Sequence, residues 1–259
     1  MARSNTGGDE RAGKRIALID LARGLALVAM TAFHFCWDLE MFAILPRGFM
    51  GSAGMIWAAR IIAGSFLFLV GFSLFLAHGP DIARGMGIRW RPFLIRLGQI
   101  VAAAALITVA TWFAEPNALV FFGILHSIAL GSVLALTFLR APWWLTAAAG
   151  LAVLTLRDAL RTEALDAPIF WWSGLSRIVP VSVDYVPVFP FFGMILLGLA
   201  AANLATPRDL LATLAAPRLD GPTSRLLRFI GRHSLIYYLA HQPVMLAILY
   251  SILWLGGRV

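Results

Sequence analysis

Long apolar segments alternate with short polar ones along most of the chain. Each apolar segment is close to the about 20 residues that a helix needs to cross the hydrocarbon core of a bilayer. The pattern therefore predicts an all-α fold, a polytopic transmembrane helical bundle of about seven spans. The predicted spans are 16–40, 55–78, 93–113, 118–139, 143–160, 186–204 and 227–254.

The polar and apolar parts also predict the domain organisation. Residues 1–14 are polar and basic, and we expect them to form a flexible cytoplasmic tail. No Gly/Ser-rich or Pro-rich tract divides residues 15–259, so we expect these to form a single transmembrane domain. The first span lacks the short apolar region and small-residue cleavage site of a signal peptide, and we expect it to remain as an anchor.

Composition supports the membrane assignment and explains the charge. Of the 259 residues, 60% are hydrophobic and 13% are charged, outside the balance of soluble domains. The net charge of +8 comes from arginines that gather at one set of span ends, fourteen Arg and Lys residues against six. The positive-inside rule then favours a cytoplasmic N-terminus. This topology accounts for the charge, so we expect contact with membrane lipid and no nucleic-acid partner.

Residues 20–38 of the first span carry Asp20, Arg23, His34 and Asp38 in an otherwise apolar stretch. Arg23 and His34 are eleven positions apart, which places them about 20° apart around the helix axis and roughly 16 Å apart along it. Asp20 lies one turn from Arg23, and Asp38 lies one turn from His34. Ionisable side chains inside a span are costly unless they are paired or line a wet cavity, so this stripe indicates a functional site.

The two pairs suggest different roles. A carboxylate one turn from an imidazole can fix its tautomer, so His34 with Asp38 is a candidate general base. The alternative is a buried histidine satisfied by helix packing. Asp20 with Arg23 fits either ligand binding or a neutralising pair that steadies the span.

A second cationic group precedes the third span. Arg91 and Arg96 lie in the basic segment 89–96, and guanidinium groups suit phosphates. We interpret them as a docking site for an anionic, nucleotide-bearing donor, with Arg96 a turn inside the span. The alternative is a cytoplasmic flank that binds anionic lipid.

Polar residues in the later spans are candidates for an acceptor site. His126 opens the fourth span, and Tyr237, His241 and Gln242 lie on or beside one face of the last. Hydrogen bonding between helices is the alternative role for these residues. A further candidate, Asp184, lies in an aromatic-rich segment before the sixth span, which could bind a sugar or lie at the membrane interface.

Other chemistries find no support in the motifs. The histidines lack the spacing of a metal site, so we expect no metal and no tightly bound cofactor. The chain has no Walker loop, dinucleotide fingerprint or G-x-S-x-G elbow, which argues against an ATPase, a Rossmann enzyme and a serine hydrolase.

Five blocks of the sequence form a recognisable pattern: RIALIDLARG (15–24, running to Trp37-Asp38-Leu39), FLFLVG (66–71), FGILH (122–126), DYVPVFPFFG (184–193) and GRHSL with HQP (231–243). These blocks resemble the bacterial branch of the heparan-alpha-glucosaminide N-acetyltransferase catalytic-domain family. The spacing from Arg23 to His34 is also similar to the arginine, ten residues, histidine motif of the acyltransferase-3 membrane enzymes.

The resemblance implies transfer of an acetyl or other acyl group from cytoplasmic acyl-CoA to a sugar amine or hydroxyl on the other side of the membrane. Lysosomal members carry their key histidine in the loop after the first span, whereas residues 43–54 contain no histidine. His34 is therefore assigned from the acyltransferase-3 spacing and its own position.

We therefore expect a transmembrane acyltransferase of the bacterial inner membrane. His34 and Asp38 are the predicted catalytic residues. Acyl-CoA binding is assigned to Arg91, Arg96, Arg23 and Asp20, and binding of the acceptor and oxyanion to His126, Asp184, Tyr237, His241 and Gln242. A proton-coupled transporter and a non-catalytic membrane partner in polysaccharide metabolism are the alternatives.

Overall fold

The computed structural model describes residues 16–206 and 221–257, so the predicted tail 1–14 lies outside the described residues. Within these two ranges, every regular element is an α-helix or a 3-10 helix. The prediction of an all-α chain is confirmed.

Five helices are long and apolar enough to cross a membrane. They correspond to five of the seven predicted spans, so the chain has the helices of an integral membrane protein. These helices are α1 (Ala17–Met41), α2 (Ala53–Ala83), α3 (Trp90–Ala114), α7 (Val188–Ala205) and α10 (Ser234–Leu255).

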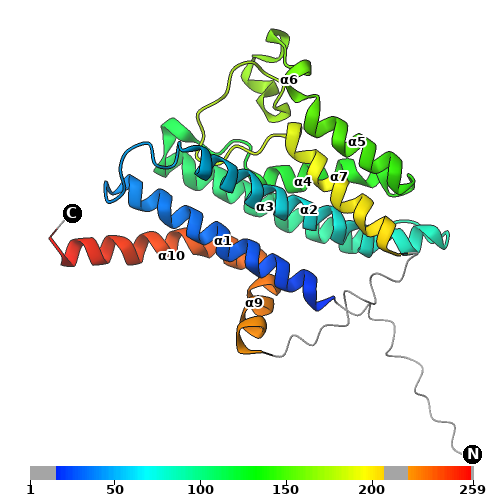
Figure 1. Ribbon diagram of the computed structural model, residues 1–259, viewed down its shortest axis with the longest axis horizontal. Helices are drawn as coiled ribbons and strands as arrows, with labels where there is room; N and C mark the ends of the chain where they lie inside the picture. Colours follow the sequence, from blue (N-terminus) through cyan, green and yellow to red (C-terminus); the bar gives the residue numbers. More distant parts are fainter. Residues whose placement is uncertain (1–15, 207–220, 258–259) are drawn as a thin grey trace, which may run out of the picture.

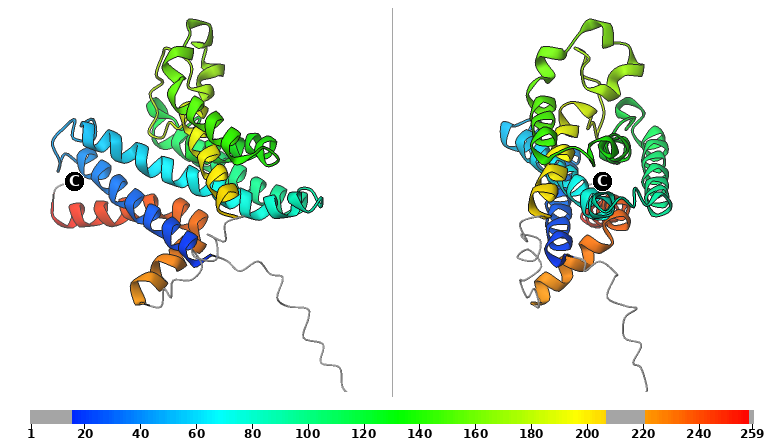
Figure 2. Two further views of the ribbon diagram at one scale, coloured as in Figure 1. Left: turned by 45° about the vertical axis from the view of Figure 1, so that its right-hand side comes forward. Right: turned by 90° about the vertical axis from the view of Figure 1, so that its right-hand side faces the viewer.

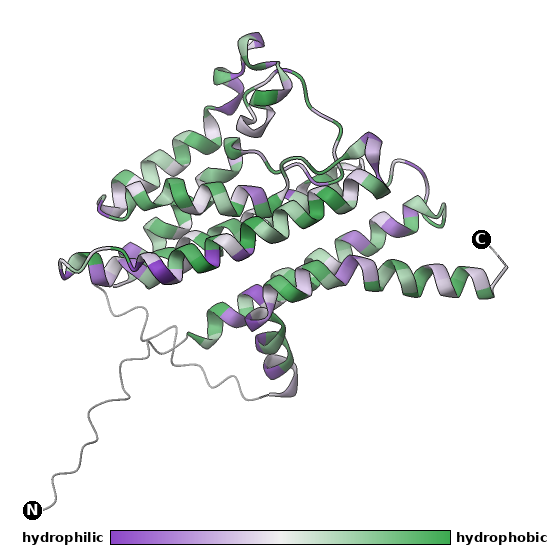
Figure 3. Cartoon of the chain, turned by 180° about the vertical axis from the view of Figure 1, so that it is seen from behind, coloured by the Kyte–Doolittle hydropathy of each residue, from purple (hydrophilic) through white to green (hydrophobic). Residues whose placement is uncertain are grey.

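The helices form three layers in the view of Figure 1. Helices α2 and α3 lie in the middle, with α1 and α10 on one side of them. On the other side, α7 lies with two shorter apolar helices, α4 (Ile124–Ala135) and α5 (Trp143–Thr155). In the view turned by 90° α3 stands apart from α2 (Figure 2), and Figure 3 shows that most residues of the long helices are hydrophobic.

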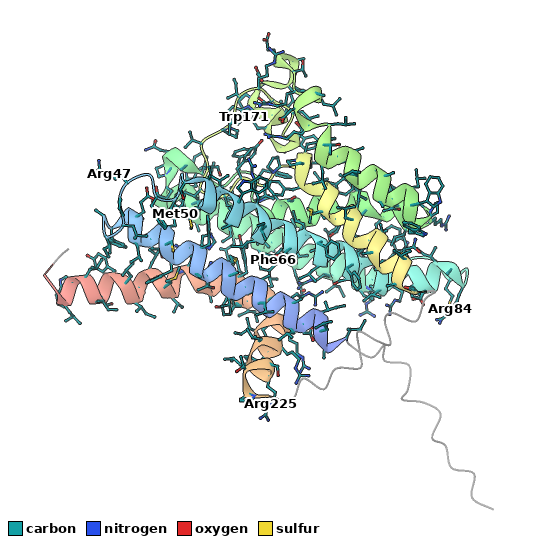
Figure 4. The ribbon with its side chains drawn as sticks, in the orientation of Figure 1. Arg47, Met50, Phe66, Arg84, Trp171 and Arg225 are labelled. Carbon is teal, nitrogen blue, oxygen red and sulfur yellow. The ribbon has the colours of Figure 1, made fainter. Side chains whose placement is uncertain are left out.

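The connecting segments gather at two ends of the bundle. Arg47, after α1, and Arg84, after α2, lie at opposite ends (Figure 4). Two backbone hydrogen bonds join other connections: Val183 N donates to the Ala118 carbonyl over 3.0 Å, and Val186 N donates to the Phe122 carbonyl over 3.1 Å. The loop before α4 and the segment before α7 therefore share one end.

The main core lies where α2, α4 and α7 meet. Leu67 of α2 and Ile195, Leu196 and Leu199 of α7 are fully buried there. Close approach of α2 and α7 requires glycine at two positions. A Cβ on Gly71 would collide with the Ile195 carbonyl, and a Cβ on Gly198 would collide with the Phe68 carbonyl.

Two predicted spans are shorter in the structure. The prediction 118–139 was wrong at its start, because α4 begins only at Ile124 and is followed by the 3-10 helix Leu136–Phe138. Residues 116–123 do not continue the helix, since this segment contains Pro116 and Gly123. The carbonyls of Ala118 and Phe122 in it accept hydrogen bonds from Val183 and Val186. The prediction 143–160 was wrong at its end, since α5 stops at Thr155 and a single turn, α6 (Arg157–Leu160), follows.

The last predicted span is broken. Residues 227–254 do not form one helix, because α9 (Pro222–Arg232) ends at His233 and α10 begins at Ser234. Arginines recur at three- and four-residue intervals in α9, so its polar face cannot continue as a lipid-facing span. Instead α9 crosses α1, where a Cβ on Gly231 would collide with the Asp20 carbonyl.

We predict that Gly198→Ala destabilises the protein. The added methyl group would push against the Phe68 carbonyl and separate α2 from α7, a change of the kind that costs about 1–3 kcal/mol. Thermal unfolding in detergent micelles measures it as a lowered midpoint. Gly98→Ala, in α3, is the control because nothing lies within 4 Å of its added Cβ. Equal midpoints for the two variants would contradict the close contact.

Candidate functional site

Three polar pairs join α1 to α10. The Thr31 and Tyr237 hydroxyl oxygens are 3.0 Å apart. One turn further along, His34 Nδ1 and His241 Nε2 are 2.9 Å apart. Beyond them, Gln242 Nε2 donates to Asp38 Oδ1 over 2.6 Å. We call these six residues the polar seam. It brings together five predicted site residues, His34, Asp38, Tyr237, His241 and Gln242, and adds Thr31.

Hydrogen bonds in the seam determine the tautomers of the neutral histidine pair. His241 Nδ1 lies 2.6 Å from the Tyr238 carbonyl, which can only accept, so this nitrogen carries the proton. His241 Nε2 is then the acceptor for the proton on His34 Nδ1. His34 Nε2 keeps its lone pair, and no described residue hydrogen-bonds it. The pair thus presents one oriented basic nitrogen.

Asp38 does not orient His34, contrary to the expectation from their spacing. Both side chains lie on the face of α1 toward α10, where His34 contacts His241 and Asp38 accepts from Gln242. Asp38 is 0% exposed. In the described part of the chain, Asp38 Oδ2 and Gln242 Oε1 are buried and lack a hydrogen-bond partner. Two hydrogen-bond acceptors therefore remain beside the histidine pair.

An apolar groove begins at the seam and follows α1 and α10 away from it. We call it the apolar groove. Its volume is about 400 Å³. Thr31, Tyr237 and His241 line its polar end. The rest of the lining is apolar and comprises Phe35, Ala240, Val244, Met245, Ile248, Leu249 and Ile252.

A second polar cluster lies nearer the start of α1. Asp20 is 5% exposed and accepts from Arg23 over 3.5 Å and from Arg232 Nε over 3.3 Å. Arg23 also donates to the Ser73 hydroxyl of α2 over 2.6 Å. The predicted pairing of Asp20 with Arg23 is present. Because Asp20 also binds Arg232, it joins the start of α1 to the end of α9.

Arg232 also lines a second groove, between α3 and the start of α10. We call it the arginine groove. Its volume is about 520 Å³, and Arg96, Gln99, His233 and Ser234 are among its polar lining residues. Arg91 is exposed in the first turn of α3 and does not line this groove. The structure thus brings Arg96 together with Arg232, and not with Arg91.

His126 and Asp184 hold the start of α4. His126 Nδ1 accepts from Gly123 N over 3.2 Å, and its Nε2 lies 3.3 Å from the Thr108 hydroxyl. Asp184 Oδ2 accepts from Ile124 N over 2.9 Å, a favourable position for a carboxylate at a helix N-terminus. Tyr238 donates weakly to the same oxygen over 3.5 Å. Both nitrogens of His126 are satisfied, which favours a structural role.

The aromatic segment before α7 is held by its own hydrogen bonds. Trp171 Nε1 donates to the Asp166 carbonyl over 2.9 Å, and the Tyr185 hydroxyl donates to the Trp171 carbonyl over 2.6 Å. The Ser176 hydroxyl, with the amides of Arg177 and Ile178, lowers the pKa of Asp166 below its ordinary value. These polar groups are used within the segment, which speaks against an open sugar platform formed by its aromatic residues.

Sequence reasoning missed four residues of these clusters: Thr31, Ser73, Arg232 and Tyr238. Thr31 lies one turn before His34, and its spacing could have placed it on the same face. Arg232 is one of several arginines in the segment 225–232, and nothing in the sequence distinguishes it as the partner of Asp20. Tyr238 acts through its backbone carbonyl, and no side-chain pattern reveals such a contact.

Comparison with known proteins agrees with the resemblance of the sequence blocks. The family described as heparan-alpha-glucosaminide N-acetyltransferase, catalytic, matches residues 15–243. The chain belongs to this family. Membership implies a membrane acetyltransferase. No curated protein and no solved structure matches the chain. Within residues 16–206 and 221–257, no group of three His, Cys, Asp or Glu side chains could hold a metal ion.

We predict that His126→Ala lowers stability by about 1 kcal/mol, the usual cost of losing a helix-capping hydrogen bond, because Gly123 N and Thr108 lose their partner. The measurement is the thermal unfolding midpoint in detergent. An unchanged midpoint combined with a lost acetyl-transfer activity would contradict the structural role and indicate that His126 takes part in the reaction.

Proposed function

We propose that the protein transfers an acetyl group from acetyl-CoA to an amine or hydroxyl of a sugar, with His34 as general base. Family membership supports acetyl transfer. The observation that carries the proposal is the hydrogen-bonded chain from the Tyr238 carbonyl through His241 to His34, which leaves His34 Nε2 as an oriented proton acceptor.

The step needs one base and one leaving group. His34 Nε2 removes the proton of the acceptor amine or hydroxyl as that atom attacks the thioester carbonyl. The carbon–sulfur bond then breaks, and the CoA thiolate leaves and takes the proton from His34 Nε2, which restores the neutral base. The positive charge that forms on His34 is stabilised by His241, whose own proton is held by a carbonyl. Thr31 donates its hydroxyl proton to the Leu27 carbonyl and accepts from Tyr237, so the Tyr237 hydroxyl, once turned from Thr31, is the proposed donor for the developing oxyanion.

The arginine groove is the proposed site for the phosphates of the donor. Arg96 and Arg232 converge there with His233, and guanidinium groups bind phosphates through paired hydrogen bonds. No residue lines both grooves, and the arginine groove is lined by none of the seam residues. The pantetheine arm therefore has to pass the start of α10. Arg232 lies at this crossing, since it also contacts Asp20 of α1.

Asp38 and Gln242 are proposed to hold the acceptor. Their two buried oxygens without partners can accept hydrogen bonds from an ammonium or hydroxyl group beside His34. His126 and Asp184 are left out of this site because they cap α4. We further propose that the arginine groove faces the cytoplasm and the seam faces the other side of a bacterial inner membrane, which fits the arginine-rich ends of the spans.

We predict that His34→Gln reduces acetyl transfer at least about 100-fold, since general-base catalysis contributes about 10²–10⁴. Acetyl-CoA binding is expected to stay unchanged, because the phosphate site lies elsewhere. The measurement combines transfer of labelled acetyl to glucosamine with isothermal titration of acetyl-CoA. His126→Ala is the control and should keep its activity per folded molecule. A His34→Gln protein with normal turnover would exclude this residue as the base.

We predict that Arg96→Gln raises the KM for acetyl-CoA about tenfold, the effect of losing one hydrogen bond to a charged group. Arg91→Gln on the same helix is the matched control. It should change the KM less than twofold, because Arg91 does not line the arginine groove. Steady-state kinetics with varied acetyl-CoA measures both variants, and equal effects of the two would refute the placement of the phosphates.

A further inference from the structure

The apolar groove extends well beyond what the proposed chemistry needs. It begins at Tyr237 and His241 and reaches Ile252, eleven residues after His241. At a rise of about 1.5 Å per residue, this is roughly 16 Å along α10. Apart from the hydroxyls and the imidazole at its seam end, its lining is hydrocarbon. A molecule in it would have one polar end at Thr31, Tyr237 and His241 and a long apolar remainder.

The apolar remainder cannot belong to the donor of an acetyltransferase. An acetyl group has two carbons, and the rest of acetyl-CoA is polar and anionic. The arginine groove, with Arg96 and Arg232, offers the opposite charge for that part. Two grooves of contrasting chemistry therefore flank α10, and only the apolar one begins at the seam.

The apolar groove is also open to the bilayer. Val244, Ile248 and Ile252 line it and are still more than half exposed, so a chain dissolved in lipid can enter from the side. Helix α10 is the least buried of the five long helices. A membrane-anchored substrate would thus reach the seam without crossing the aqueous phase.

We propose that the acceptor is an amphiphile, a sugar amine or hydroxyl carried on a hydrocarbon anchor. Its anchor lies in the apolar groove, and its polar head lies at Thr31, Tyr237 and His241, where His241 is hydrogen-bonded to His34. This inference rests on the proposed function and adds the class of acceptor to it. The anchor acts as a guide: burial of each methylene in the groove adds affinity for the acceptor and holds its head at the base.

The test compares two acceptors that differ only in the anchor. Glucosamine and dodecyl glucosaminide are offered to the purified protein in nanodiscs with labelled acetyl-CoA. We expect kcat/KM to be at least tenfold higher for dodecyl glucosaminide. Val244→Trp, which fills the groove, should remove this preference to within twofold while leaving the rate with glucosamine unchanged. Val109→Trp is the matched control, because Val109 and Val244 are both 54% exposed and only Val244 lines the groove.

Binding is measured separately from turnover. Dodecyl glucosaminide should raise the thermal unfolding midpoint of the native protein and of Val109→Trp, and not that of Val244→Trp. Transfer to glucosamine with no preference for the anchored sugar would overturn the inference and leave the proposed function intact. If bulk lipid fills the groove, the native protein, Val109→Trp and Val244→Trp show the same midpoint shift. If a second copy of the chain covers the groove, Val244→Trp changes the oligomeric state. Either result overturns the inference.

Discussion

Hydrogen bonding across the polar seam is the interaction on which the rest of the structure depends. Helix α10 buries little of its surface, so apolar packing contributes little to its position. In lipid, apolar surfaces between helices gain no hydrophobic advantage, and polar pairs stabilise association by about 0.6–2 kcal/mol each. The pairs of Thr31 with Tyr237, His34 with His241 and Asp38 with Gln242 therefore both fix α10 against α1 and set the geometry of the candidate base.

Charged and titratable groups lie inside an apolar bundle because they both hold helices together and form the candidate sites. Asp20 is buried, yet two arginines from different elements neutralise it and join α9 to α1. That pairing positions Arg232 beside Arg96 in the arginine groove. The helix break at His233 follows from the same contact: α9 turns aside to reach Asp20, and α10 begins a new direction along the seam.

The sequence predicted the apolar spans well and the partners of individual side chains less well. Hydropathy placed the first span at 16–40, against Ala17–Met41 in the structure, because each residue of a span contributes independently to its transfer from water. The spacing of His34 and Asp38 showed a shared face and suggested mutual contact. It could not show that α10 presents His241 and Gln242 to that face, since this depends on how two distant helices pack. The break at His233 was missed for the same reason, because it depends on the contact of Arg232 in α9 with Asp20 in α1.

The central claim is that one end of acetyl-CoA lies among the arginines while its thioester lies against the seam. The most direct measurement is a structure of the protein with a non-hydrolysable acetyl-CoA analogue in lipid nanodiscs. The account predicts phosphate density in contact with Arg96 and Arg232, a pantetheine arm passing the start of α10, and the acetyl carbonyl within hydrogen-bond reach of the polar seam. Density for the acetyl end remote from His34, with the seam unchanged and untouched by the analogue, would contradict it.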